Sequence, residues 1–160
     1  KLLWGQNAGF EVPEFVTTLG DTTVGSLTRT VFIPKIAQVK PVAAKVNAMY
    51  KAKTGNDLSG ASARSFTGLQ AWVHVLEKAG SLKPADIQKA ANAIEIPGDE
   101  LVVPWQGIKF ATTGDDIGQN TLGMGLIGQY QKGADGKIDL EIVYPFNVPT
   151  ANMIYPFPKF

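Results

Sequence analysis

The sequence predicts an α/β fold in which parallel sheets are flanked by helices and closed by an antiparallel hairpin. Strand-like and helix-like segments alternate over the first half of the chain, and two strand-like segments near the end flank a loop with an Asp-Gly pair. Such alternation favours a parallel sheet, because parallel strands need a long crossover connection that is usually a helix. With 160 residues, 44% of them hydrophobic and 18% charged, the chain is able to bury a core.

The first half is predicted to begin with a strand over Lys1–Gly5 that runs into a loop. A short helix follows over Pro13–Leu19, because proline suits the first helical turn and a glycine comes directly after the segment. A segment rich in β-branched residues, Thr22–Ile33, is predicted to be a strand. The next helix, Val39–Thr54, has apolar residues along one face and ends before a glycine.

The second half is predicted to begin with the longest helix, Ser62–Gly80, followed by a helix over Pro84–Ala93. Apolar residues recur at helical spacing in the longest helix and are expected to face the core: Phe66, Leu69, Val73 and Leu76. Three strands are predicted after these helices: Gln106–Phe110, Leu126–Gln131 and Ile138–Tyr144. The last two are joined by a hairpin loop over Lys132–Lys137.

The end of the chain is rich in proline and aromatic residues. Four of the ten prolines fall within the last sixteen residues. Proline lacks a backbone donor and so disfavours a helix there, and so many aromatic rings are not expected to stay in water. Residues 146–160 are therefore predicted to lie extended against another surface.

Composition and charge exclude several classes of protein. The 15 Lys and Arg residues nearly balance the 14 acidic ones, giving a formal charge of +1 without any basic run, so nucleic acid is not expected as a partner. No apolar run approaches the roughly 20 residues that cross a bilayer. The absence of cysteine removes disulfides, thiolate zinc sites and cysteine nucleophiles. No metal is expected, because the acidic residues lack the spacing of a calcium loop, and no cofactor is expected either.

The stretch Gly123–Gly128, GMGLIG, matches G-x-G-x-x-G, the fingerprint of dinucleotide-binding folds. Such a site needs a helix after the glycines, so that the helix N-terminal amides meet the pyrophosphate. Here Gly128 leads into a strand-like segment and a hairpin loop instead. We therefore interpret the glycines as part of a strand, where they allow a close backbone approach or a bulge.

A catalytic site is a weak alternative. The only histidine, His74, lies in the middle of the longest predicted helix between two valines, and Ser62 lacks the second glycine of a nucleophile elbow. A hydrolase that used these two residues would need them within hydrogen-bond reach of each other. No catalytic residue is assigned.

Two segments support a binding site. In open α/β sheets ligands lie at the carboxyl ends of the strands, and the loop after the opening strand offers small and amide residues there: Gln6, Asn7, Ala8 and Phe10. The second segment is the start of the longest helix, where the helix amides and the guanidinium of Arg64, beside Phe66, could hold a carboxylate. An ordinary glycine turn and a capped helix with a solvated arginine remain the alternatives.

Three groups of stretches, taken in order, carry a resemblance to a known family: Arg64–Leu69 with Leu76–Ser81; Trp105–Phe110 with Gly114 and Gly118–Asn120; and Ile127–Gln129 with Asp135–Lys137 and Val143–Pro145. Together they resemble the second half of periplasmic solute-binding proteins of the branched-chain amino acid transport class, which have the type I periplasmic-binding fold. The first group resembles the family's helix with its "AL-x-x-AGS" ending, the second its "G-x-x-F-x-x-x-G" stretch, and the third its closing hairpin.

The resemblance implies a fragment of a larger two-lobed protein that binds a solute between its lobes and docks on the membrane permease of an ABC importer, in the periplasm. It implies that residues 1–58 end one lobe and that residues 59–145 return to the other lobe and include the hairpin. Residues 146–160 form the tail. The missing first half would come from a companion chain or from an exchanged dimer. A sensory domain of a receptor or regulator with the same fold is the alternative function, and a hydrolase is a more distant one.

The resemblance also bears on the ligand. Amino-acid-binding members carry an acidic residue in the loop after the opening strand, where this sequence has Asn7. An amide supplies no charge for an ammonium group, so an aromatic or aliphatic carboxylate becomes a candidate beside an amino acid. The resemblance places Arg64 and Phe66 at the border of the same cleft.

Overall fold

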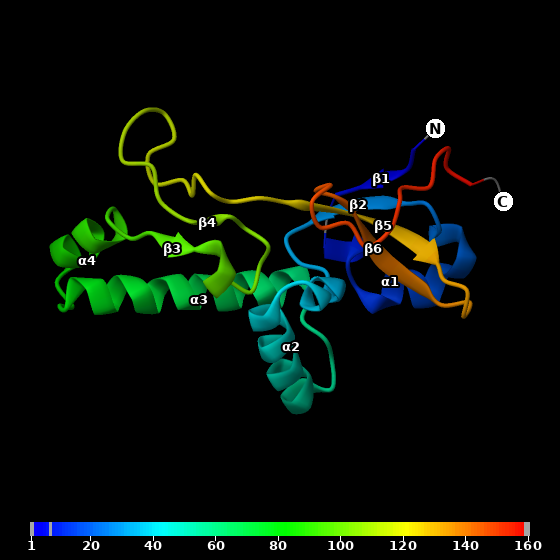
Figure 1. Ribbon diagram of the computed structural model, residues 1–160, viewed down its shortest axis with the longest axis horizontal. Coiled ribbons are helices and arrows are strands. Elements are labelled where there is room, and N and C mark those ends of the chain that lie inside the picture. The colour runs from blue at the N-terminus through cyan, green and yellow to red at the C-terminus, as the bar shows by residue number, and fades with distance from the viewer. Residues whose placement is uncertain (1, 7, 159–160) are drawn as a thin grey trace.

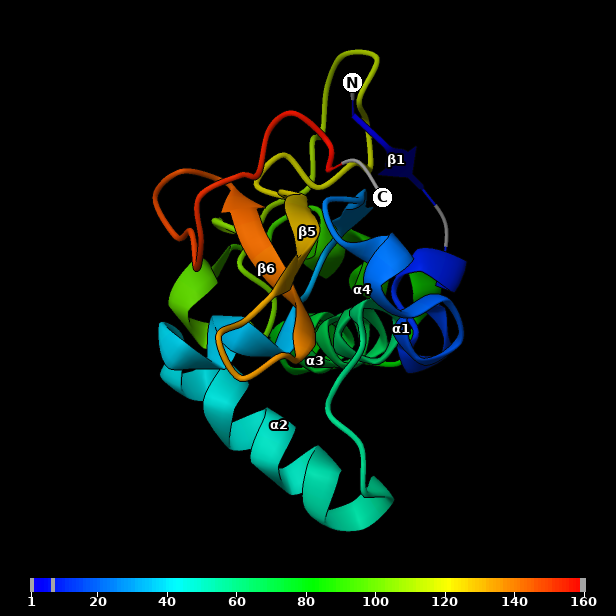
Figure 2. The same cartoon turned by 90° about the vertical axis from the view of Figure 1, so that its right-hand side faces the viewer.

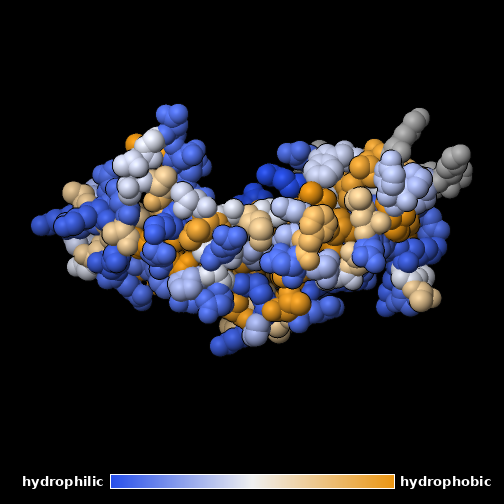
Figure 3. Space-filling model, turned by 45° about the horizontal axis from the view of Figure 1, so that its top comes forward, coloured by the Kyte–Doolittle hydropathy of each residue, from blue (hydrophilic) through white to orange (hydrophobic). Residues whose placement is uncertain are grey.

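The computed structural model describes residues 2–6 and 8–158, and the chain forms two parts joined at a narrow junction (Figure 1). The sheet lobe contains a four-stranded sheet and helix α1, Pro13–Leu19. The helical lobe contains α3, Gly60–Ala79, and α4, Pro84–Ala91. Helix α2, Pro41–Thr54, projects from the junction in Figure 1 and points away from the rest of the chain in Figure 2. In the space-filling view the molecule is elongated and hollowed between its two ends (Figure 3).

The sheet combines segments from both ends of the chain. Its strand order is β1-β2-β5-β6. Strand β1 lies parallel to β2, whereas β2 with β5 and β5 with β6 are antiparallel. The α/β class is confirmed, but the parallel arrangement expected from the sequence is limited in the described chain to the pair of β1 and β2. The strands are β1, Trp4–Gly5; β2, Leu27–Thr30; β5, Leu126–Lys132; and β6, Ile138–Tyr144.

The closing hairpin, β5 with β6, forms where it was predicted but joins the sheet that the first strands begin. Leu27 of β2 pairs with Gln129 of β5. The resemblance, in contrast, assigns the hairpin to the lobe formed by residues 59–145. The chain thus leaves the sheet lobe after α2 and returns to it at β5. The lobe boundaries at residues 58 and 145 stay a prediction.

Two predicted strands are much shorter in the structure. The segment Thr22–Ile33 contains only the four residues of β2, because its start is a 3-10 turn held by Thr23, whose hydroxyl donates to Gly20 O at 2.9 Å. Side-chain bonds of this kind compete with strand formation. The segment Gln106–Phe110 contains only β4, Gly107–Ile108. This strand pairs with β3, Ile96–Pro97, which was not predicted.

Helix α3 buries a different face from the one predicted. Its buried residues include Ala63, Thr67 and Val75, whereas Phe66 and Leu69 are exposed. The prediction that Phe66, Leu69 and Val73 pack on the core of this chain is therefore wrong for the described structure, whereas Leu76 is half-buried. The physical reason is that small residues allow α3 to approach the neighbouring backbone closely. Large side chains at helical spacing mark the opposite face of the helix.

One hydrophobic cluster runs through both lobes and their junction. Its members include residues of α3 and the buried Leu101–Val103 segment, Ile36 between β2 and α2, and Leu126 and Ile142 of the hairpin. This shared core fixes the start of α3 against the end of β2, where the candidate site lies.

The C-terminal tail lies against the sheet lobe of the same chain (Figure 2). The fully buried Gln129 holds it: Nε2 donates to Gly25 O and Ile154 O, both at 3.0 Å, and Oε1 accepts from Ile154 N at 2.7 Å. The predicted supporting surface is therefore supplied at least in part by this chain. Phe146 and Tyr155 remain exposed.

The glycine-rich stretch leads into β5, so a dinucleotide site is excluded there. Gly128 is buried within the strand, and a strand follows it where a phosphate site would need a helix. The pairing of β5 with β6 shifts between Ile127 and Gly128, which confirms the expected bulge. A Cβ on Gly128 would lie 2.7 Å from Leu140 Cδ1, which explains the need for glycine.

Candidate functional site

A cavity of about 240 Å³ lies where the loop after β1, the end of β2 and the start of α3 meet. Two residues singled out in the sequence, Gln6 and Arg64, line it although they are distant in the chain. We call this space the arginine cavity. The other residues that line it are Glu11, Arg29, Thr30, Val31 and Ala61.

Aromatic packing fixes the loop that carries Gln6 and Glu11. The ring of Phe10 occupies the space where a side chain on Gly5 would lie, and it packs on Phe15 with 4.9 Å between ring centroids. The hydroxyl of Tyr130 donates to Phe10 O at 2.8 Å. Burial, with a smaller contribution from the charge of Glu11, raises the pKa of Tyr130 to about 12, so the hydroxyl keeps its proton and remains a donor.

Glu11 lies between the end of β2 and the first turn of α3. Its Oε2 accepts a hydrogen bond of 2.9 Å from the hydroxyl of Thr30, which is buried at the end of β2. A Cβ on Gly60, the first residue of α3, would lie 2.5 Å from both of these oxygen atoms. The backbone of α3 therefore passes so close to this pair that a side chain does not fit at position 60.

The arginine cavity has an excess of positive charge. Burial raises the pKa of Glu11, and the hydrogen bond from Thr30 and the charges of Arg64 and Arg29 offset only part of this rise. Two guanidinium groups thus face one carboxyl group. A guanidinium can donate two parallel hydrogen bonds to a carboxylate, and the N-terminal end of α3 adds a favourable dipole. The arrangement is suited to binding a small organic anion.

The amide of Ser62 is not free for a ligand. The hydroxyl of Ser59 accepts from it at 3.2 Å, and the hydroxyl of Ser62 accepts from Ser59 N at 2.8 Å. This reciprocal cap uses donors of the first turn of α3. Arg64 is consequently a better candidate than this amide for holding an anion.

The other predicted site residues lie at different places. Phe10 packs beneath the loop, and Phe66 is exposed on the outer side of α3, so neither lines the arginine cavity. Ala8 begins a short 3-10 helix that ends at Phe10. Asn7 lies outside the described residues. Contact of these four residues with a ligand stays a prediction.

Sequence reasoning missed three polar residues of the cavity: Glu11, Arg29 and Thr30. Glu11 follows Phe10 directly, so extending the candidate loop by one residue would have included it. Arg29 and Thr30 lie inside β2, and the sequence gives no sign of which end of this strand approaches α3.

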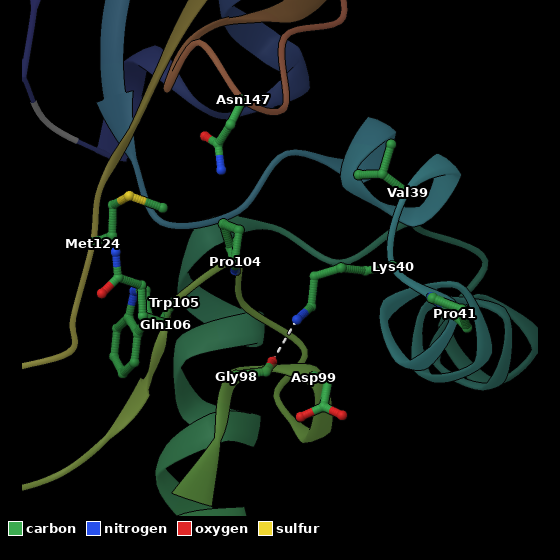
Figure 4. A pocket seen from close by; sticks show the side chains of 10 residues that line it. All are labelled: Val39, Lys40, Pro41, Gly98, Asp99, Pro104, Trp105, Gln106, Met124 and Asn147. Atoms are coloured by element: carbon green, nitrogen blue, oxygen red, sulfur yellow. Dashed lines mark hydrogen bonds between the residues drawn. The ribbon is translucent and has the colours of Figure 1, made fainter.

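A second cavity, of about 680 Å³, lies between the lobes near the start of α2 (Figure 4). The ammonium of Lys40 reaches across it and donates to Gly98 O at 2.6 Å. Burial lowers the pKa of Lys40, and the charge of Asp99 opposes this shift. Asn147 points into the same space, and the buried Nε1 of Trp105 has no hydrogen-bond partner in the part of the chain described. Lys40 thus ties the start of α2 to the helical lobe.

The geometry does not support the hydrolase that the sequence left as an alternative. Ser62 and His74 lie twelve residues apart on α3, which at 1.5 Å per residue separates them by about 18 Å along the axis. Hydrogen-bond contact between them is therefore impossible. Over residues 2–6 and 8–158, no three His, Cys, Asp or Glu side chains are grouped to hold a metal ion. In the same residues, no helix has the length and apolar character needed to cross a bilayer.

No family model and no curated protein matches this sequence. Its fold matches solved structures. An ABC transporter substrate-binding protein from Sphaerobacter thermophilus matches with a TM-score of 0.67 and 15% identity, over 96% of this chain and 38% of that one. A leucine-, isoleucine-, valine-, threonine- and alanine-binding protein from Brucella ovis matches with a TM-score of 0.62 and 18% identity, over 92% and 37%.

A periplasmic binding protein type 1 from Bordetella pertussis also matches, with a TM-score of 0.59 and 22% identity, over 88% of this chain and 38% of that chain. At such identities the likeness concerns the fold alone. The chain spans less than two fifths of the length of each of these proteins.

Proposed function

Because the chain has the fold of part of a type I periplasmic binding protein, we propose that it belongs to a solute-binding protein and captures a small organic solute without chemical conversion. The observation that carries the proposal is the arginine cavity, where Gln6 from the sheet lobe and Arg64 from α3 meet at the junction of the lobes. Ligand pockets commonly lie between domains, and hinge closure around the solute is a familiar motion of such folds.

The solute proposed is an amino acid or an aromatic or aliphatic carboxylate. Arg64 would hold the carboxylate through its guanidinium, and Gln6 would form a hydrogen bond to a neighbouring polar group. The positive excess of the cavity supports an anionic group on the solute, because the charge of Glu11 is already opposed by Arg64 and Arg29. Asn7, Ala8, Phe10 and Phe66 are proposed to border the solute as the sequence resemblance implies.

The proposed setting is extracytoplasmic, with the membrane permease of an ABC importer as the partner. Two comparisons support this setting, since the Sphaerobacter protein is named as an ABC transporter component and the Bordetella protein as a periplasmic one. The Brucella protein is named as binding amino acids, which supports the choice of solutes to test.

The test is ligand-dependent thermal stabilisation of the natural protein with a panel of amino acids and aromatic and aliphatic carboxylates. A ligand at 100 times its Kd stabilises the native state by about 2.7 kcal/mol. Replacing Arg64 with alanine should weaken binding by about 10- to 100-fold, because a hydrogen bond to a charged group contributes about 1.5–3 kcal/mol. Lys53→Ala, at an exposed position near the end of α2, is the control.

The affinity of the Lys53→Ala protein should equal that of the natural one. Absence of a thermal shift with every solute of the panel would contradict solute capture. Equal affinities of the Arg64→Ala and natural proteins would contradict the role of the arginine cavity.

A further inference from the structure

The only two arginines of the sequence line the same cavity. Of the 15 basic residues only Arg29 and Arg64 are arginines, and both border the arginine cavity although they are distant in the chain. In the part of the chain that the structure describes, no lysine lines it. Arginine differs from lysine in its planar fork of donors, which binds a carboxylate through two parallel hydrogen bonds. The choice of residue therefore indicates carboxylate recognition rather than a general positive charge.

Two different elements hold these guanidinium groups. Arg29 lies in β2, and a Cβ on Gly125 would lie 3.7 Å from its Cγ, so the stem of Arg29 runs beside the backbone that leads into β5. Arg64 lies about one turn into α3, whose first residue, Gly60, packs closely on the end of β2. One arginine thus belongs to the sheet lobe and the other to the helical lobe.

The forks of both arginines are free. Within residues 2–6 and 8–158, neither guanidinium forms a hydrogen bond or an ion pair. Glu11 lines the same cavity, but its carboxyl group accepts the hydrogen bond from Thr30 instead. A single carboxylate fills one fork, so two free forks on separate elements suit a solute with two carboxylates.

Glu11 does not prevent a second negative charge from entering. Burial raises its pKa, which lowers the cost of keeping this group neutral. The hydroxyl of Thr30 also lies 3.2 Å from Phe32 O, so it can donate to that carbonyl while it accepts from a protonated Glu11. With Glu11 neutral, the two guanidinium groups carry two positive charges, which a dianion balances.

The volume of the cavity agrees with a short organic dianion. Its 240 Å³ correspond to about eight water molecules at roughly 30 Å³ each. A short dicarboxylate such as glutarate is of this size, whereas inorganic phosphate would fill only part of the space. A short dicarboxylate also separates its two charges, as two arginines on different elements require.

We infer that the solute captured between the lobes is a dicarboxylate, with one carboxylate on Arg64 and the other on Arg29. The inference rests on the proposed function and narrows its solutes from carboxylates in general to those with two carboxylate groups. Arg29 is then the residue that determines this specificity. Because each arginine belongs to a different lobe, the dianion also links the two lobes when it binds.

Isothermal titration calorimetry of the natural protein with matched pairs of solutes tests this inference. The pairs are glutarate and its monoamide, glutamate and glutamine, and terephthalate and its monoamide. The two members of a pair have nearly the same size and shape but differ by one negative charge. In at least one pair the dicarboxylate should bind about 10- to 100-fold more tightly than the amide, as expected for a hydrogen-bonded charged group.

Variants of Arg29 assign this preference to its side chain. Arg29→Gln should reduce the preference to about threefold or less, because an amide lacks the charge and the parallel donors. Arg29→Lys keeps the charge but not the fork, so it should retain part of the preference. The control Lys53→Ala, at its exposed position on α2, should keep all of it. Far-ultraviolet circular dichroism checks that each variant is folded.

The possible failures separate this inference from the proposed function. Equal binding of dicarboxylates and their monoamides would overturn the inference and leave solute capture intact. An unchanged preference in Arg29→Gln, or tighter binding of inorganic phosphate than of any dicarboxylate, would also overturn it. Absence of binding by every solute, monocarboxylates included, would instead contradict the proposed function and the inference together.

Discussion

Replacing Gly60 with alanine should destabilise the protein, whereas the same replacement at Gly68 on the same helix should stabilise it. Glycine in a helix costs about 0.5–1 kcal/mol relative to alanine, because it loses more conformational freedom on folding. Gly68 is exposed, and a Cβ there would meet no atom within 4 Å, so Gly68→Ala should gain about this amount.

At Gly60 the added Cβ would lie 2.5 Å from Thr30 Oγ1 and from Glu11 Oε2. The carboxyl group can swing away, but the hydroxyl of Thr30 is buried on a β-branched side chain with few rotamers. The first turn of α3 must therefore move away from β2. Overpacking of this kind costs about 1–3 kcal/mol, and it also disturbs the wall of the arginine cavity.

Urea denaturation followed by tryptophan fluorescence measures both variants. The free energies of unfolding of the two alanine variants should differ by about 1.5–4 kcal/mol, in favour of Gly68→Ala. Similar stabilisation by both replacements would refute the close approach of α3 to Glu11 and Thr30, and with it the geometry of the candidate site.

Three further predictions concern the tail, the carboxyl group of the cavity and the core. Gln129→Leu removes the two hydrogen bonds to Ile154 in the tail and the one to Gly25, and should cost about 2–4 kcal/mol, with faster hydrogen exchange at the Ile154 amide; an unchanged exchange rate would contradict the anchoring role. Burial raises the native pKa of Glu11, so ionisation costs stability as pH rises above its unfolded value of about 4.3. The stability advantage of Glu11→Gln should therefore grow above that pH and level off beyond the native pKa, as measured by denaturation at several pH values; a constant difference would argue against this burial. Leu101→Ala should cost about 2–5 kcal/mol in urea denaturation because Leu101 is fully buried, whereas Leu82→Ala should change stability by less than about 0.5 kcal/mol; equal losses would contradict the assigned core.

The sequence predicted those elements whose local signals agree with their final environment. Helix α1 and strand β6 have the predicted bounds, because proline begins the helix and alternating side chains mark the strand. Strand β2 begins later than predicted, because hydrogen bonds from local hydroxyl groups form a turn over the first residues of the predicted strand. The pairing of β2 with β5 depends on residues that are distant in the chain, and no local pattern reports it.

For the candidate site, sequence patterns predicted Gln6 and Arg64 but not the residues of β2 that line the same cavity. Gln6 and Arg64 each belong to a local pattern, a loop after a strand and the start of a helix. Arg29 and Thr30 enter the cavity only because β2 ends against α3, which is a tertiary contact. The buried face of α3 was missed for a related reason, since the large residues that give the strongest periodic signal do not face the core of this chain.

The pairing of β2 with β5 also has a consequence for the order of folding. Leu27 pairs with Gln129, so this contact closes a loop of roughly a hundred residues, whereas the turn between β5 and β6 closes over about five. The longer closure costs about 2.6 kcal/mol more in chain entropy. The hairpin is consequently expected to form first and to join the sheet late, as a preassembled unit. Until the hairpin joins, β2 remains an open edge, and a chain whose synthesis stops before β5 keeps that edge available for wrong partners.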